Sequence, residues 1–389
     1  MILTNKQEQG LKIAVERYKN KEKYTIISGY AGSGKSTLVR FIIAALGIKE
    51  EDVCYATYTG KAAQVLLKKG NKNVYTLHKL LYKSIPKPNG GFLRIPKEVI
   101  PYKVIIVDEV SMAPKKLMQL LSTHNVHIIC LGDPFQLPPV DKNEDNHLLD
   151  HPHIFLDEIM RQAQESEIIR LSMQIRHMEE IPFSNGKEVM VLPKQELNTG
   201  MLTWASQIIV GTNTTRVSIN NQMRQLLGRG EVPEDGDKVI CLKNYWDDLA
   251  DNDDPLINGT IGYIYKPTID KIKLPYFAGG QTIESLNAYF TSDSNADFGT
   301  LHMDNKMILT GEKCVDWKTE YKINRNEKTR GLIPKEFTYG YAITGHKSQG
   351  SEYPKVLGIE DKFPFDKIEH ARWLYTVATR AEEKFVLLR

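Results

Sequence analysis

The chain has 389 residues, 41% of them hydrophobic and 25% charged, which is enough for two or three domains with separate hydrophobic cores. Its 51 Lys and Arg against 48 Asp and Glu give a formal charge of +3, which neither requires nor excludes a nucleic-acid partner. The four scattered cysteines form no C-x-x-C pair, which argues against a disulfide framework or a metal cluster. The N-terminus turns polar at once and no apolar run could span a bilayer, so we expect a cytoplasmic protein without a membrane partner.

The first 154 residues alternate helices and strands, a pattern typical of α/β layers with largely parallel sheets. The pattern predicts helices at residues 6–18, 35–46 and 61–69, and strands at 24–28, 53–56, 104–107 and 127–131. Residues 81–101 interrupt this alternation with Pro, Asn and Gly between mixed segments. We expect a small hairpin there that projects from the first domain.

A second alternating region begins near Phe155. It predicts helices at residues 165–179, 215–227, 342–348 and 367–379, and strands at 207–211, 355–359 and 384–388. Between residues 247 and 334 the alternation is replaced by short strands and many turns, which indicates a small β-barrel-like insertion. The expected division is therefore residues 1–80 with 102–154, the hairpin 81–101, residues 155–246 with 335–389, and the insertion 247–334.

A phosphate-binding pattern, G-x-x-x-x-G-K-[ST], lies between the first predicted strand and its helix. Its glycines let the backbone wrap an anion, and the helix N-terminus adds a favourable dipole. Lys35 is expected to reach the β- and γ-phosphates of ATP, and Ser36 to bind Mg²⁺. The residues expected to bind the nucleotide here are Gly29, Ala31, Gly32, Ser33, Gly34, Lys35, Ser36 and Thr37.

Two carboxylates follow the apolar run at residues 104–107. A buried strand that ends in acids delivers them to the carboxyl edge of a parallel sheet, beside the phosphate loop. We expect Asp108 to hold Mg²⁺, and Glu109 to orient and deprotonate the attacking water. This pair and the phosphate loop together predict an ATPase, but they do not say what the ATPase moves.

Further motifs follow in a fixed order, and they are more specific than the ATP site. They are TYTGKAA at 57–63, TLH at 76–78, DEVSM at 108–112, LGDPFQLPPV at 131–140, YAITGHKSQGSE at 341–352 and YTVATRA at 375–381. In this order the strings resemble superfamily 1B DNA helicases of the Dda and RecD type, over nearly the whole chain. The resemblance implies two RecA-like P-loop domains, with a pin hairpin inserted in the first and an SH3-like β-barrel in the second.

The resemblance also implies roles for single residues. Gln7 would read adenine, Gln136 would couple the γ-phosphate to the DNA track, and Gly350 and Glu352 would belong to the nucleotide site. Arg161 and Arg380 would stabilise the negative charge that develops on the transferring phosphoryl group. The residues expected to contact DNA are Thr59, Lys61, Thr76, His78, Phe92, Asn213, Thr344 and His346.

Two of these DNA contacts have an ordinary alternative. His346 could equally be a structural histidine, and Phe92 could pack on its own hairpin without stacking on a base. The implied function is a 5′→3′ single-stranded DNA translocase and helicase of replication, recombination or repair, which would act on forked or tailed duplexes. Single-strand-binding or replisome proteins are its candidate partners. An RNA-directed motor of the same superfamily, or a nucleotide-controlled binding switch without translocation, is the alternative function.

Overall fold

A computed structural model of the chain describes residues 3–86, 92–138, 142–160, 165–252, 255–326, 328–329, 331–361 and 366–389. The chain forms two compact units. Residues 1–85, 94–213 and 344–389 make the first unit, and residues 86–93 and 214–343 make the second. The four-part division into domains with exact residue boundaries remains a prediction.

The first unit contains a parallel sheet with strand order β3-β2-β6-β7-β1-β8. Its strands are β1 (Tyr24–Gly29), β2 (Val53–Thr57), β3 (Val74–Thr76), β6 (Val104–Val107), β7 (His127–Gly132) and β8 (Ile154–Leu156). Its helices are α1 (Asn5–Lys19), α2 (Lys35–Leu46), α3 (Gly60–Lys68), α4 (Leu77–Leu81) and α5 (Lys115–Thr123). The parallel α/β fold class predicted from the sequence is therefore confirmed.

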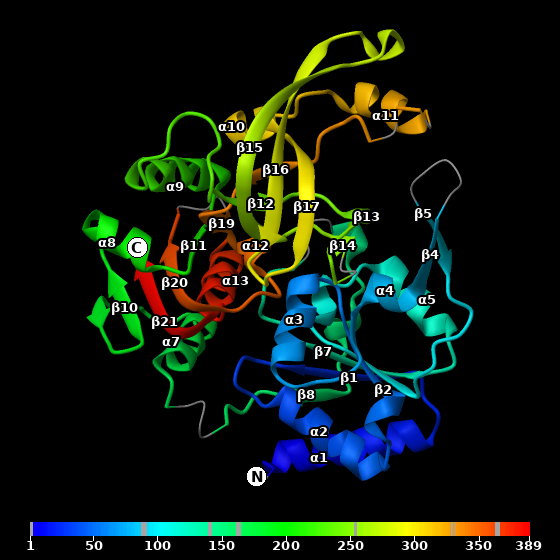
Figure 1. Ribbon diagram of the computed structural model, residues 1–389. Helices are drawn as coiled ribbons and strands as arrows, with labels where there is room; N and C mark the ends of the chain where they lie inside the picture. The colour runs from blue at the N-terminus through cyan, green and yellow to red at the C-terminus, as the bar shows by residue number, and fades with distance from the viewer. Residues whose placement is uncertain are drawn as a thin grey trace. The chain divides into compact units, whose positions relative to one another are not determined.

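Successive residues of these strands pack into two separate cores. Ile105 faces a core completed by α4 and α5, whereas its neighbour Ile106 faces a core completed by α1 and α2. Both side chains are fully buried. Figure 1 shows α1 and α2 on one side of this sheet and α4 and α5 on the other. Burial on both faces explains why these strands are continuous apolar runs in the sequence.

A second sheet of the first unit contains the order β11-β20-β21-β10-β9. These strands are β9 (Ser184–Asn185), β10 (Val189–Leu192), β11 (Gln207–Val210), β20 (Tyr353–Ile359) and β21 (Ala381–Leu388). The helices of this region are α7 (Glu167–Arg176), α8 (Thr199–Trp204), α12 (Gly345–Ser348) and α13 (Lys367–Ala378). Helix α9 (Asn213–Leu226) belongs to the second unit except for its first residue. Strand β10 pairs with β21, β21 with β20 and β20 with β11 in parallel, whereas the edge strand β9 pairs antiparallel with β10.

The helix predicted at residues 342–348 is wrong in its first part. Ala342–Thr344 form strand β19, and the helix α12 begins only at Gly345. Ala342 and Ile343 are fully buried, and the backbone N–H of Ala342 donates to Asn220 Oδ1 at 2.8 Å. Tertiary burial of a short apolar segment therefore overrides the local helical pattern.

A two-stranded sheet stands where the hairpin is predicted. It consists of β4 (Tyr82–Pro86) and β5 (Phe92–Pro96). The turn between them lies outside the described residues.

The second unit is built around an antiparallel sheet with strand order β17-β16-β15-β12-β18. Its elements are β12 (Lys238–Cys241), β13 (Tyr245–Leu249), β14 (Pro255–Leu256), β15 (Ile261–Lys273), β16 (Thr282–Ser292), β17 (Asp297–Asp304), α10 (Asn305–Thr310), α11 (Trp317–Arg325) and β18 (Phe337–Tyr339). Strands β15 and β16 form a long curved ribbon (Figure 1). An isolated parallel bridge between Met303 and Lys335 joins the end of β17 to the residues before β18. The small β-barrel stays a prediction.

Among the residues that the structure describes, no helix has both the length and the apolar character needed to cross a bilayer.

Candidate ATP and nucleic-acid site

The loop between β1 and α2 has the backbone geometry of an anion cradle. Gly32 and Gly34 have φ angles of +74° and +79°, which glycine adopts without strain. A Cβ atom on Gly29 would lie 2.7 Å from Ser33 Oγ, so a larger residue would not fit there. Gly34 is the N-cap of α2, and the loop therefore leads directly into a helix N-terminus, where an anion is favoured.

Lys35 lies at this loop as predicted. Its Nζ donates to the backbone carbonyls of Gly29 at 2.7 Å and Tyr30 at 3.1 Å. Ser36 is exposed on the first turn of α2 and Thr37 is half-buried. A flexible ammonium group can exchange these neutral carbonyl oxygens for anionic phosphate oxygens, to which it binds more strongly.

Gln7 packs directly against the same loop. Its Nε2 donates to the carbonyl of Ser33 at 3.2 Å, and its Oε1 accepts from the backbone N–H of Thr4 at 3.1 Å. The side chain is 1% exposed. Both ends of the amide are therefore engaged by the protein, and adenine recognition by Gln7 stays a prediction that requires these bonds to rearrange.

Asp108 and Glu109 follow β6 at the carboxyl end of the sheet. Burial, and then the charge of Glu109, raise the pKa of Asp108 to about 6, while Lys35 acts in the opposite direction. The charged form of such a half-buried carboxylate is stabilised by a nearby cation, and Mg²⁺ prefers oxygen ligands. The Asp108 carboxylate and the exposed Ser36 hydroxyl are oxygen donors, so the residues fit a magnesium ion bound together with phosphate.

The side chain of Gln136 lies between Glu109 and Arg380. With its amide in the orientation that satisfies both ends, the nitrogen donates to Glu109 Oε2 at 3.2 Å and the oxygen accepts from Arg380 Nη2 at 3.1 Å. Gln136 is buried. Three residues predicted as catalytic from three separate motifs are thus in direct contact.

The Arg380 guanidinium is held in a fixed position. It is 4% exposed, and it donates to the carbonyl of Thr376 through Nε and to that of Ser351 through Nη1, both at 3.1 Å. A preorganised cation can stabilise developing negative charge without reorganising during the reaction. Arg161, the second predicted arginine, lies outside the described residues, and its role stays a prediction.

Sequence reasoning missed several side chains that connect these motifs. The Tyr375 hydroxyl accepts from the Ala31 N–H at 2.8 Å and donates to Asp133 Oδ2 at 2.5 Å. The backbone N–H of Leu137 donates to Thr376 Oγ1 at 3.0 Å, and the carbonyl of Leu137 accepts from Gln349 Nε2 at 2.5 Å. All of these residues lie within the recognised strings, but a string does not indicate which side chain reaches which partner.

Two of the threonines expected to contact DNA begin helices. Thr59 is the N-cap of α3, and its hydroxyl accepts from Ala62 N–H. Thr76 is the N-cap of α4, and its hydroxyl accepts from Lys79 N–H. Each of these hydroxyls already has a structural partner, so contact with DNA stays a prediction for both threonines.

Lys61, on the first turn of α3, lies over an aromatic ring. Its Nζ is 4.3 Å from the centroid of Tyr353, a residue at the start of β20. Gly350 has φ +69°, and a Cβ there would lie 3.0 Å from Thr59 Oγ1. Glu352 pairs with Lys69 at 3.0 Å. The segment around Gly350 and Glu352 therefore contacts α3, while its expected role in binding nucleotide stays a prediction.

The two histidines expected to contact DNA both lie in surroundings that disfavour the charged form of the imidazole ring. His78 lies against Tyr82, with 6.2 Å between ring centroids, and burial followed by the charge of Arg94 lowers its pKa to about 4. Burial also lowers the pKa of the half-buried His346. We therefore expect both rings to be neutral at pH 7, so that any DNA contact would be a hydrogen bond or a stacking contact.

The other residues expected to contact DNA each have a defined position in the fold. Asn213 is exposed at the first residue of α9, and Thr344 is half-buried at the end of β19. Phe92 begins β5. Their contacts with DNA stay predictions.

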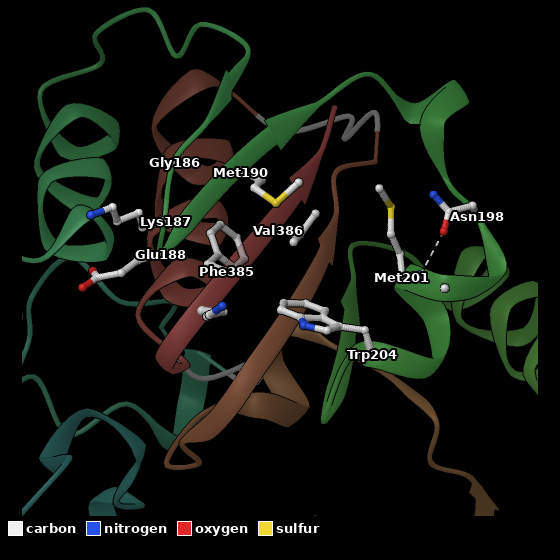
Figure 2. A pocket seen from close by; sticks show the side chains of 11 residues that line it. Gly186, Lys187, Glu188, Met190, Asn198, Met201, Trp204, Phe385 and Val386 are labelled. Carbon is white, nitrogen blue, oxygen red and sulfur yellow. Dashed lines mark hydrogen bonds between the residues drawn. The ribbon is translucent and has the colours of Figure 1, made fainter.

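A separate pocket of about 400 Å³ contains none of the predicted site residues. Figure 2 shows Met190, Trp204, Phe385 and Val386 around it, on strands β10 and β21 and helix α8. The N-cap bond from the Met201 N–H to Asn198 Oδ1, at 3.0 Å, lies at its edge. None of the residues expected to take part in ATP hydrolysis therefore lines this pocket.

Comparisons with known families and sequences agree with the predicted motifs. A family described as an AAA domain matches residues 3–185, and one described as a UvrD-like helicase C-terminal domain matches residues 339–388. The ATP-dependent RecD2 DNA helicase of Deinococcus radiodurans is 25% identical over 93% of this chain and 46% of its own length. The ATP-dependent DNA helicase dda of Enterobacteria phage T4 is 36% identical over 36% of this chain and 34% of its own. The chain thus spans about half the length of the first of these relatives and a third of the second.

Solved structures share the fold. A Pif1 helicase from Bacteroides, determined with ADP-AlF3 and single-stranded DNA, matches with a TM-score of 0.51 at 18% identity. A second Pif1 structure, described as showing unwinding at forked duplex DNA, matches with a TM-score of 0.50 at 18% identity. Each match covers 100% of this chain and 92% of the other. These matches show that the fold is that of two RecA-like α/β regions, as predicted. The predicted resemblance to DNA helicases of the RecD and Dda type agrees with the sequence relatives.

Proposed function

We propose that this chain is an ATP-dependent DNA helicase that moves along single-stranded DNA in the 5′→3′ direction and separates duplexes. The observation that carries the proposal is the contact of Gln136 with both Glu109 and Arg380. An amide that touches both the general base and the charge-stabilising arginine joins the chemistry of hydrolysis to two separate parts of the fold.

Each residue of the site has its own role in ATP hydrolysis. Lys35 binds the β- and γ-phosphates, Glu109 accepts a proton from the attacking water, and Arg380 stabilises the charge on the transferring phosphoryl oxygens. Asp108 and Ser36 would hold magnesium. When bound, that ion neutralises phosphate charge and helps to align the phosphoryl group for in-line attack.

The loop that contains Gln136 favours a motor over a simple switch. Both backbone polar groups of Leu137 are bonded to side chains of the second α/β region, namely Thr376 and Gln349. A change at the γ-phosphate that moves Gln136 would therefore also act on α12 and α13. Nucleotide-gated movement between two α/β regions is the step that a translocase needs and that a static binding module does not.

The nucleic-acid side of the proposal rests on the relatives and on the recognised motifs. Both relatives are described as DNA helicases. Lys61 supplies a cation for the DNA backbone, and Phe92 an aromatic ring that could stack on a base at the fork. The 5′→3′ direction, the cytoplasmic location and the association with single-strand-binding or replisome proteins belong to the same proposal.

Unwinding of matched tailed duplexes tests this function. One duplex carries a 5′ single-stranded tail and the other a 3′ tail of equal length and composition, with ATP and Mg²⁺ present. We expect strand separation of the 5′-tailed DNA only. Unwinding of the 3′-tailed DNA alone would overturn the direction, and unwinding restricted to RNA-tailed substrates would support an RNA-directed motor. ATP hydrolysis without any strand separation would indicate a nucleotide-controlled switch.

A further inference from the structure

The hydroxyl of Tyr375 joins two loops that both lie at the ATP site. It accepts a hydrogen bond from the N–H of Ala31, in the phosphate loop, and donates one to Asp133, directly after β7. Tyr375 is 1% exposed, and Asp133 is 3% exposed. Burial, and then the charge of Asp133, raise the pKa of Tyr375 well above its ordinary value, so the hydroxyl keeps its proton and acts as a donor.

Asp133 belongs to the turn that carries Gln136. Its other oxygen, Oδ1, accepts from the backbone N–H of Phe135 at 2.9 Å, and the Phe135 ring lies edge-on to Tyr375 with 5.3 Å between centroids. The next residue of α13, Thr376, bonds the N–H of Leu137. The turn is therefore held on α13 at both ends, with Gln136 between the two attachments.

We propose that Tyr375 is a positioning residue that transmits the state of the phosphate loop to Gln136. Nucleotide phosphates accept hydrogen bonds from backbone N–H groups of the loop, and one N–H group of this loop, that of Ala31, is bonded to Tyr375. A shift of Ala31 changes the Tyr375–Asp133 bond, and Asp133 sets the conformation of the turn that presents Gln136 to Glu109 and Arg380. This proposal rests on the proposed function, because it concerns how DNA-stimulated hydrolysis is coupled.

The change Tyr375→Phe removes only the oxygen atom of this link. The ring and its contact with Phe135 stay, but the Ala31 N–H loses its acceptor and Asp133 loses a donor. Because Asp133 is buried, the loss of one donor to its carboxylate is costly. The turn can then relax, so that Gln136 no longer follows the phosphate loop, while Lys35 and the loop glycines still bind ATP.

The test is steady-state ATP hydrolysis by the full chain, with and without single-stranded DNA, as a function of ATP concentration. For Tyr375→Phe we expect the stimulation of kcat by DNA to fall roughly tenfold or more, the scale of a hydrogen bond to a charged group, with KM for ATP changed much less. Asp133→Asn keeps Tyr375 and should lower the stimulation in the same direction. The double variant should be no worse than the more impaired single variant, because both changes break one link.

Tyr339→Phe is the matched control. Tyr339 is 5% exposed, and its hydroxyl has no hydrogen-bond partner among the residues that the structure describes. We expect it to keep normal stimulation and a similar melting temperature. A wild-type protein without DNA-stimulated hydrolysis would defeat the proposed function itself. Normal stimulation in Tyr375→Phe, or equal losses in kcat and in ATP binding, would overturn the positioning role alone. If Tyr375→Phe does not fold, Asp133→Asn decides in the same way.

Discussion

The strands in the parallel sheets of the first unit differ in burial from those in the antiparallel sheet of the second unit. Strands β6 and β7 are buried along their whole length, and each is followed directly by a carboxylate, Asp108 and Asp133. Strand β15, in contrast, exposes most residues of its second half. Apolar strands that are buried on both faces thus place carboxylates at their ends, whereas the long ribbon of β15 and β16 exposes much of its surface.

The same difference predicts where substitutions act. A change at a strand end in the first unit should alter chemistry more than stability. A change on the ribbon should leave ATP hydrolysis intact, since no residue of the described ATP site lies there.

Arg380→Ala should slow ATP turnover strongly. In the proposed mechanism its charge stabilises the transition state, and such arginines supply roughly 10³–10⁵ in rate, so turnover should fall far more than ATP affinity. The check is kcat measured beside nucleotide binding by fluorescence titration. Arg380→Lys keeps the positive charge but loses the planar guanidinium, so its turnover should lie between those of the wild type and of Arg380→Ala. Equal losses in turnover and in ATP affinity would instead mean that Arg380 contributes to the binding of ATP in the ground state or to the stability of the fold.

Glu109→Gln should slow hydrolysis by about 10²–10⁴-fold while ATP still binds with Mg²⁺, because the amide keeps the shape but cannot accept a proton. Single-turnover hydrolysis and equilibrium binding on the same preparation separate the two steps. Lost binding with normal residual chemistry would show that Glu109 holds the nucleotide and is not the base.

Asp108→Asn should abolish turnover yet stabilise the free protein at high pH. The folded-state pKa of Asp108 is about 6, above its ordinary value of 3.8, so the fold disfavours the charged form. The charge therefore lowers stability above about pH 6, and this penalty disappears as the pH falls towards 4. Thermal unfolding without nucleotide or magnesium should show a higher melting temperature for Asp108→Asn at pH 8, with the difference shrinking below pH 6. A lower melting temperature for this variant at pH 8 would contradict the raised pKa.

A pair of identical substitutions compares the two kinds of strand directly, with the smallest effect on chemistry. Ile105 in β6 is 0% exposed and Ile269 in β15 is 42% exposed. Ile105→Ala should lower the free energy of unfolding by about 2–5 kcal/mol. Ile269→Ala should change it by about 0.5 kcal/mol or less. Denaturant unfolding measures both, and similar losses would mean that the ribbon contributes to a core after all.

The sequence predicted the parallel strands and the position of the phosphate loop because both depend on local patterns. A buried parallel strand is an apolar run, and the phosphate loop is a contiguous string between a strand and a helix. The prediction was wrong at Ala342–Thr344, where burial of a short apolar segment produces a strand although the local pattern indicates a helix. In the second unit, strands exposed on one face and irregular turns give a weaker signal, so the sequence indicated a barrel-like insertion but not its strand order.

The contacts between motifs could not be predicted at all. Tyr375 and Asp133 are 242 positions apart, and Leu137 and Gln349 are 212 apart. Such pairs depend on how two α/β regions pack, which no local pattern records. The same limit applies to Gln7, for which the resemblance implied contact with adenine but not the observed bond to the phosphate-loop carbonyl of Ser33.

The most direct test of a DNA-responsive ATPase at this phosphate loop is ATP turnover by wild-type protein and Lys35→Ala, each with and without single-stranded DNA. Lys35 is proposed to bind phosphate and does not belong to the hydrophobic cores of the sheet, so the variant should fold and melt like the wild type. We expect wild-type turnover to rise on addition of DNA, and Lys35→Ala to show no turnover in either condition. Near-native, DNA-stimulated hydrolysis by a folded Lys35→Ala would contradict the assignment of the site.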